Sequence, residues 1–190
     1  MSAAYCRAAP AHPVHARYHD LEYGFPSADE HVLFERLVLE INQAGLSWLT
    51  ILNKRAAFRA AFADFDVDRV AAFGAEDRAR LLADAGIVRN RLKIDAAVEN
   101  ARRIQGIRRA HGSFAAWIDA HHPRPVDEWT ELFRSTFTFT GWQIVNEFLM
   151  SLGYLPGAHE PDCSVYARIA AHSPPWAKSV GCNPIVSINK

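Results

Sequence analysis

The sequence predicts an all-α protein built as a single compact unit, residues 1–190. Segments with apolar side chains at helical spacing follow one another along most of the chain, and several begin at a serine or aspartate that can cap the first turn. Residues 136–140 alternate like a β-strand, but no second strand is found to pair with them, so we expect an extended connector there. With 49% hydrophobic residues, the chain is able to bury a full core.

Proline and glycine divide the chain into its expected elements. The first 28 residues are expected to be irregular, because they are interrupted by Pro10, Pro13, Gly24 and Pro26. Helices are then expected over 29–43, 47–63, 67–73, 75–83, 90–109, 114–120, 126–134, 141–152 and 163–170. The expected N-caps are Asp29, Ser47, Asp66 and Ser113, and the expected helix stops are Gly45, Gly74, Gly86, Gly112 and Gly153.

Composition and charge bound the possible functions. Basic and acidic residues number 21 each, so the net charge gives no argument for nucleic acid. No apolar run approaches the roughly 18 residues of a membrane span, and the N-terminus lacks the layout of a signal peptide. Three cysteines, Cys6, Cys163 and Cys182, make a poor disulfide framework and suit a reducing compartment. We therefore expect a soluble, cytoplasmic monomer without a membrane partner, whose thiols are free to bind metal.

An acidic residue lies on the apolar stripe of the first long helix. Glu40 follows Leu33 and Leu37 at helical spacing, so its carboxylate should face the core. Because burial of an unpaired carboxylate is costly, Glu40 either has hydrogen-bond donors or is reserved for a ligand. Gly45 then ends the helix, which leaves Leu46 exposed at the tip of a tight corner.

Three aromatic residues accompany this acid in the sequence, namely Tyr18, Tyr23 and Trp48. Aromatic faces beside a carboxylate suit a flat cationic base, and each face can contribute about 0.5 to 2 kcal/mol. The alternative is that the rings are ordinary core residues of a helical protein. The presence of Glu40 favours a binding site over an ordinary core, because a carboxylate on an apolar helix face is costly to bury unless it has a partner or a ligand.

Four potential metal ligands lie near the two ends of the chain. His159 and Cys163 are four residues apart, a separation at which both can point the same way, and Cys6 and His19 supply the same two groups at the other end. Together they make the Cys2His2 set of a closed tetrahedral zinc site, although each could instead be an ordinary buried cysteine or surface histidine. Such a metal ion would join the two ends of the chain in one structural unit.

We expect one lobe from 1–45 with 113–175, a helical lobe over 46–112, and a tail over 176–190.

Residues 81–94 predict a helix, a hairpin containing glycine, and a second helix. Gly86 allows a sharp turn, after which backbone N–H groups such as that of Val88 and a helix N-terminus can bind phosphate oxygens. Arg89, Arg91 and Lys93 add positive charge at that point. The pattern fits a DNA contact, but any helical hairpin can hold a glycine and a few arginines.

Residues 39–48 read Leu-Glu-Ile-Asn-Gln-Ala-Gly-Leu-Ser-Trp, which resembles the signature of the 3-methyladenine DNA glycosylase I family of the helix-hairpin-helix superfamily. The resemblance runs from about residue 6 to about residue 166. It implies an all-helical glycosylase fold, with the helix-hairpin-helix at about 81–94. It also implies a base-excision repair enzyme, whose partner is double-stranded DNA containing alkylated bases. The implied reaction is hydrolysis of the N-glycosidic bond of 3-methyladenine and related alkylated purines.

The resemblance also implies roles for single residues. Glu40 accepts hydrogen bonds from the edge of the base, and Tyr18 and Trp48 stack on it, while Tyr23 stands where the family's Glu-Trp-Gly motif has tryptophan. Leu46, next to Gly45, fills the gap left by the extruded nucleotide. One structural zinc ion is held by Cys6, His19, His159 and Cys163. No lysine nucleophile is obvious beside the hairpin, so we expect a monofunctional hydrolase without lyase activity.

Two rival functions stay open at this point. The first is a catalytically inactive, zinc-stabilised module that binds DNA or lesions. It is suggested by Ala8, where well-known members have tryptophan, and by a shortened segment at 122–129. The second is a zinc hydrolase that uses the four metal ligands in catalysis, which requires an open coordination position on the metal.

Overall fold

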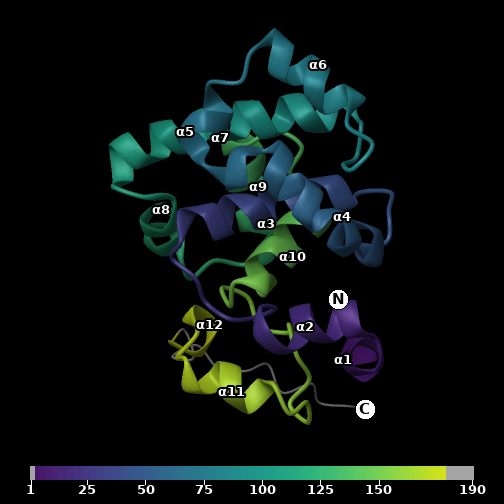
Figure 1. The fold of residues 1–190 in the computed structure, drawn as a ribbon. Helices are drawn as coiled ribbons and strands as arrows, with labels where there is room; N and C mark the ends of the chain where they lie inside the picture. The colour runs from purple at the N-terminus through teal and green to yellow at the C-terminus, as the bar shows by residue number, and fades with distance from the viewer. Residues whose placement is uncertain (1–2, 179–190) are drawn as a thin grey trace.

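The computed structural model describes residues 3–178 and confirms the all-α prediction, because these residues contain helices and no strand. Figure 1 shows their arrangement. The α-helices are α1 (Ala3–Ala8), α2 (Pro13–Leu21), α3 (Glu30–Gln43), α4 (Trp48–Ala61), α5 (Val67–Ala71), α6 (Ala75–Ala83), α7 (Arg91–His111), α8 (Phe114–His121), α9 (Val126–Thr136), α10 (Trp142–Ser151), α11 (Tyr166–Ala171) and α12 (Pro175–Lys178), with the 3₁₀ helices η1 (Ala9–Ala11) and η2 (Ala63–Phe65). Of the predicted tail, residues 179–190 lie outside the described part, and the division into two lobes stays a prediction.

The prediction of an irregular N-terminus was wrong. α1, η1 and α2 make residues 3–21 almost continuously helical. Pro10 and Pro13 were taken as breakers, but each lies at the first or second position of its own helix. A proline is tolerated there because the N–H that it lacks has no partner within the helix. The prolines therefore start helices in this segment.

The predicted N-caps are confirmed. The side chains of Asp29, Ser47, Asp66 and Ser113 each accept a hydrogen bond from a backbone N–H in the first turn of the following helix. As expected, α3 and α7 end near glycines with positive φ: Gly45 (+84°) lies two residues after the end of α3, and Gly112 (+87°) directly follows α7. Gly74 was predicted to stop a helix but instead begins α6, because its N–H donates to the carboxylate of Asp77 at 3.1 Å.

Helix α3 lies at the centre of the fold. It packs against α4, α7, α8 and α10, while α5 and α6 pack on α7 at the top of Figure 1. Its core-facing residues include Leu33, Phe34, Leu37 and Ile41, none of which is more than 1% exposed. Glu40 lies on this same helix, so the packing of α3 fixes its position. None of the described helices is long and apolar enough to cross a membrane.

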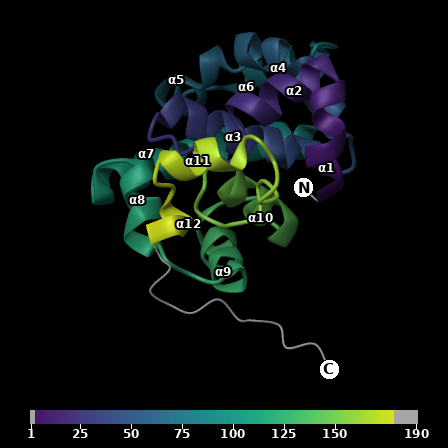
Figure 2. The same cartoon turned by 90° about the horizontal axis from the view of Figure 1, so that it is seen from below.

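The N-terminal helices α1 and α2 lie beside the segment that precedes α11, in the lower part of Figure 1 and also in the view of Figure 2. Cys6 on α1 lies 3.8 Å from His159, and His19 on α2 lies 3.7 Å from Cys163, measured between sulfur and ring nitrogen. The fold thus brings together the residues that the sequence predicted as metal ligands.

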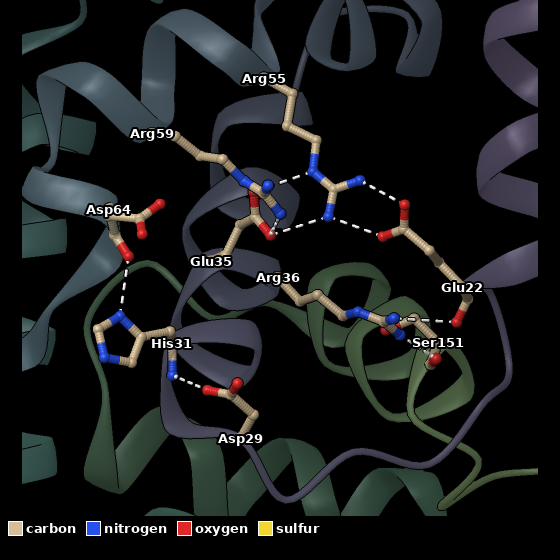
Figure 3. Close-up of polar contacts among 9 residues, drawn as sticks. All are labelled: Glu22, Asp29, His31, Glu35, Arg36, Arg55, Arg59, Asp64 and Ser151. Atoms are coloured by element: carbon tan, nitrogen blue, oxygen red, sulfur yellow. Dashed lines mark hydrogen bonds and ion pairs between the residues drawn. The ribbon is translucent and has the colours of Figure 1, made fainter.

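Figure 3 shows a network of ion pairs around Glu35, a buried residue of α3. Glu35 is 2% exposed, and its Oε1 accepts hydrogen bonds from Nε of Arg55 at 2.9 Å and from Nε of Arg59 at 2.6 Å. Burial alone raises the pKa of this carboxyl, but the hydrogen bonds from Arg59 and Arg55 outweigh it and lower the pKa to about 2. Arg55 also pairs with Glu22 at 2.7 Å, which ties α4 to the segment after α2.

Candidate functional site

Glu40 lies at a cavity of about 300 Å³ between the end of α3 and the start of α10. The residue is 2% exposed, and its carboxylate has no hydrogen-bond partner among residues 3–178. The cavity is lined by Glu40, Gln43, Ala44, Gly45, Leu46, Ser47, Gln143 and Ile144. The structure therefore combines a buried acid with an opening beside it, and residues 3–178 offer that acid no hydrogen-bond partner.

Burial, and to a smaller extent the nearby carboxylate of Glu147, raise the pKa of Glu40 to about 8, against a smaller opposing effect of Arg36. At neutral pH the Glu40 carboxyl is therefore largely protonated. A ligand cation that approaches it would reverse this balance, because an opposite charge favours the ionised form. The site is thus arranged to exchange a proton for a bound positive charge.

The predicted aromatic residues lie behind Glu40 and do not line the cavity. Tyr18 and Trp48 are 3% and 7% exposed, and their ring centroids are 5.2 Å apart with planes at 60°. A purine stacked between two rings needs about 7 Å between them, twice the van der Waals spacing of about 3.5 Å, so none fits there without movement. The Tyr18 hydroxyl and the Trp48 indole N–H are both buried without a partner in the described chain.

Tyr23 is fully buried, and its hydroxyl donates to Oε2 of Glu147 at 2.9 Å. In this structure it therefore ties the segment between α2 and α3 to α10. The sequence led us to expect its ring on the cavity surface, but Tyr23 does not line the cavity. The residues that sequence reasoning missed lie on α10, namely Gln143, Ile144 and Glu147. Gln143 and Glu147 are polar residues four apart in a helix that is mostly apolar, which is a signal that was present in the sequence.

The corner after α3 has the predicted form. Leu46 is 42% exposed at its tip and lines the cavity. Lys93, predicted to contact DNA, is 5% exposed instead, and its ammonium donates to the carbonyls of Asn42 at 3.0 Å and Ala44 at 2.6 Å. Lys93 therefore caps the C-terminal end of α3, where unpaired carbonyls favour a cation, and the structure gives its predicted DNA contact no support.

The hairpin between α6 and α7 borders a second depression of about 630 Å³, which Leu46 shares with Val88 and Arg89. The N–H groups of Val88 and Arg89 have no acceptor in the described chain, and the Arg89 side chain is exposed. Gly86 is required for close packing, because a Cβ there would lie 2.9 Å from the Cβ of Ala57. Its N–H already donates to Asp84 at 2.7 Å, so Gly86 shapes the hairpin but does not offer a free donor.

Cys6, His19, His159 and Cys163 form one cluster, with their ligand atoms all within 4.8 Å of one another. Bonds of about 2.3 Å to sulfur and about 2.0 Å to nitrogen at tetrahedral angles place sulfur and nitrogen about 3.5 Å apart. The distances from Nδ1 of His159 to the sulfurs of Cys163 and Cys6 are 3.5 Å and 3.8 Å. The cluster therefore fits a tetrahedral metal ion.

The outer hydrogen bonds of the two imidazoles support this assignment. Nδ1–H of His19 donates to Asp20 at 2.6 Å, and Nε2–H of His159 donates to the carbonyl of Tyr23 at 2.8 Å. The second nitrogen of each ring, Nε2 of His19 and Nδ1 of His159, lies next to the Cys163 sulfur and is available to a metal ion. Asp20 is therefore the carboxylate that orients the ring of His19.

Comparison with known proteins places this geometry in a family. The sequence model of methyladenine glycosylases matches residues 8–130. The chain is 38% identical over 173 residues to DNA-3-methyladenine glycosylase 1 of Escherichia coli K12, covering 81% of this chain and 92% of that protein. It is 33% identical over 169 residues to DNA-3-methyladenine glycosylase of Haemophilus influenzae, covering 79% of this chain and 91% of that protein.

Solved structures agree. The chain superposes with a TM-score of 0.76, at 33% identity and covering 87% of this chain and 97% of that one, on 3-methyladenine DNA glycosylase I of Staphylococcus aureus, solved to explain 3-methyladenine recognition. Two further relatives carry single substitutions. One replaces tyrosine by phenylalanine, is bound to 3-methyladenine and matches with a TM-score of 0.74 at 34% identity, covering 80% of this chain and 92% of that one. The other, also from S. aureus, replaces glutamate by glutamine and matches with a TM-score of 0.73 at 34% identity, covering 81% and 92%. The chain belongs to the methyladenine glycosylase family.

Proposed function

We propose that this protein is a base-excision DNA glycosylase, which hydrolyses the N-glycosidic bond of 3-methyladenine in DNA. The observation that carries this proposal is the buried Glu40 carboxyl at its cavity, to which residues 3–178 give no hydrogen bond. A 3-methylated adenine carries a positive charge while it is attached to the sugar, so it can take the place of the proton on Glu40. That exchange stabilises the cation at a site that otherwise stays neutral.

The chemistry that remains is modest, because a cationic base is already a good leaving group. The electron pair of the N-glycosidic bond moves to the base, which leaves neutral, and water adds to the sugar carbon with loss of a proton. We assign Glu40 as the group that holds the base through hydrogen bonds to its edge. The buried, unpartnered donors of Tyr18 and Trp48 beside it support a polar ligand there.

Two substituted relatives support the same two residues. The numbers of the substituted tyrosine and glutamate in those relatives differ by 22, which is also the separation of Tyr18 and Glu40 in this chain. We therefore assign Tyr18 and Trp48 to base stacking, with the adjustment of the rings that the 5.2 Å spacing requires. Tyr23 acts behind them, through its hydrogen bond to Glu147.

The amine of Lys93 is held by two backbone carbonyls of α3, so it is not available as a nucleophile toward the sugar. This supports a monofunctional hydrolase without lyase activity. On the DNA side we assign Leu46 as the wedge that replaces the extruded nucleotide, and the hairpin N–H groups with Arg89 and Arg91 as phosphate contacts.

We assign the Cys2His2 cluster to one structural zinc ion per chain, held by Cys6, Nε2 of His19, Nδ1 of His159 and Cys163. Four protein ligands leave no open position for water, so this zinc would stabilise the fold and would not act in hydrolysis. The rival of a zinc hydrolase requires an open position that the four clustered ligands do not provide.

An excision assay tests the function. DNA treated with a methylating agent is incubated with the protein, and the released bases are separated and identified. We expect free 3-methyladenine from the wild type and a large loss of release with Glu40→Gln. DNA binding without release of any base would instead support the rival function of an inactive lesion-binding module.

A further inference from the structure

The connector between α9 and α10, residues 137–141, carries an exposed phenylalanine in a strained conformation. Phe139 has φ of +65°, and its side chain is 43% exposed. A bulky residue in the left-handed region costs roughly 1 to 3 kcal/mol, and such strain persists only where the surrounding structure imposes it. The conformation of Phe139 therefore needs a cause in its neighbours.

That cause is a buried asparagine on α7. Asn100 is fully buried, and its Oδ1 accepts hydrogen bonds from the N–H of Thr138 at 2.8 Å and from its hydroxyl at 3.0 Å. Nδ2 of Asn100 donates to the carbonyl of Thr138 at 3.1 Å. Arg103 adds a hydrogen bond to the carbonyl of Thr136 at 2.8 Å. Three hydrogen bonds to Asn100 thus fix Thr138, the residue directly before Phe139. This holds the phenylalanine at the surface.

Phe139 lies next to the proposed base site. It lines a depression of about 620 Å³ together with Arg134 and Ile144, and Ile144 also lines the Glu40 cavity. On the other side, Leu46 lines both that cavity and the depression at the hairpin. Because they share residues, the three depressions are contiguous. They run from the hairpin past Leu46 and the cavity to Phe139.

We propose that Phe139 is a second apolar contact to DNA, which stacks on a base beside the extruded nucleotide, and that Arg134 binds a phosphate of the same strand. This inference rests on the proposed function. Extrusion of a nucleotide leaves its neighbours with an exposed face, and aromatic side chains provide a replacement for lost stacking. Arg134 is exposed and has no acidic partner within the described chain, so its charge is available to a phosphate.

The test uses Phe139→Asn, because asparagine tolerates the left-handed conformation and keeps the connector fold. Leu21→Asn is the matched control, since Leu21 is 59% exposed and lines a depression that shares no residue with these three. Binding is measured with a labelled duplex that contains one abasic-site analogue. We expect the Kd of Phe139→Asn to rise roughly tenfold, within the range of single-base stacking, and that of Leu21→Asn to stay unchanged.

Two further readouts identify a stacking role. The slope of log Kd against log salt should stay at its wild-type value in Phe139→Asn, because no phosphate contact is lost. Its Kd for free 3-methyladenine should also stay unchanged. If Phe139→Asn melts well below the wild type, Phe139→Leu is used, which keeps an apolar side chain without the ring and should show a smaller loss of the same kind.

Wild-type DNA affinity in both Phe139 variants would overturn this proposal. A parallel loss of DNA binding and free-base binding would also overturn it, since it would show a general change of the cavity. A wild-type dimer that dissociates in Phe139→Asn would overturn it too, because Phe139 would then contact a second copy of the chain. Failure of the proposed function appears separately, as a wild-type protein that releases no 3-methyladenine.

Discussion

Replacing Glu40 by glutamine should stabilise the protein while it removes activity. The substitution keeps the size of the side chain and removes a carboxyl that folding takes out of water. Because folding raises the pKa of Glu40 from 4.5 to about 8, the folded state resists ionisation of this group. The resulting loss of stability is absent below pH 4.5 and fully present above pH 8.

The size of the effect follows from those two pKa values. At about 1.36 kcal/mol per pH unit, ionisation of Glu40 lowers the free energy of unfolding by about 2 kcal/mol at pH 6 and by about 4 kcal/mol at pH 8. Glutamine does not titrate in this range, so the burial of its amide contributes equally at both pH values. The advantage of Glu40→Gln over the wild type should therefore grow by about 2 kcal/mol between pH 6 and pH 8.

Urea unfolding of both proteins at the two pH values measures this difference, with the metal content checked in each sample. Any pH dependence of metal retention affects both proteins and cancels in the comparison. A stability difference between the two proteins that does not change with pH would refute the assignment of Glu40 as a buried carboxyl with a raised pKa.

Three further predictions concern other parts of the molecule. The double variant Arg89→Ala with Arg91→Ala should weaken duplex binding and reduce the salt slope by up to about 1.8, with unchanged affinity for free 3-methyladenine, because each phosphate contact contributes about 0.9 to that slope. The purified protein should contain one zinc ion per chain by elemental analysis. Cys163→Ser should lose it and melt at a lower temperature, and a metal-free protein with wild-type stability would contradict the structural role. Glu35→Ala should lower the free energy of unfolding by roughly 3 to 5 kcal/mol at pH 7, because it leaves Arg55 and Arg59 without their buried partner. The stabilisation by Glu35 should be present above pH 4.5 and lost as the pH falls through about 2, which urea unfolding at several pH values would reveal.

Much of the fold could be predicted from the sequence because its signals are local. The capping side chains at Asp29, Ser47, Asp66 and Ser113 act within one helical turn, and so does the left-handed glycine at Gly45. The prediction that the alternating segment before α10 pairs with no strand is confirmed for the described residues, but Thr136 still belongs to α9 and Phe139 is left-handed instead of extended. The N-terminal helices were missed because the same prolines that break helices also begin them.

The site was only partly predictable because much of it depends on contacts between distant segments. Glu40 stood out as an acid on an apolar stripe, and its burial is confirmed. The sequence could not show that Gln143 faces it across the cavity, more than a hundred positions away. Lys93 was assigned to the surface by its charge, whereas the carbonyls at the end of α3 hold it in the interior.

The central claim is that the cavity beside Glu40 receives the alkylated base. A crystal structure of the wild-type protein with 3-methyladenine tests it most directly. We expect the base in the cavity between Glu40 and Gln143, within hydrogen-bonding distance of the Glu40 carboxylate. A base bound elsewhere, for instance in the depression beside Leu21, with the Glu40 cavity empty, would contradict the claim.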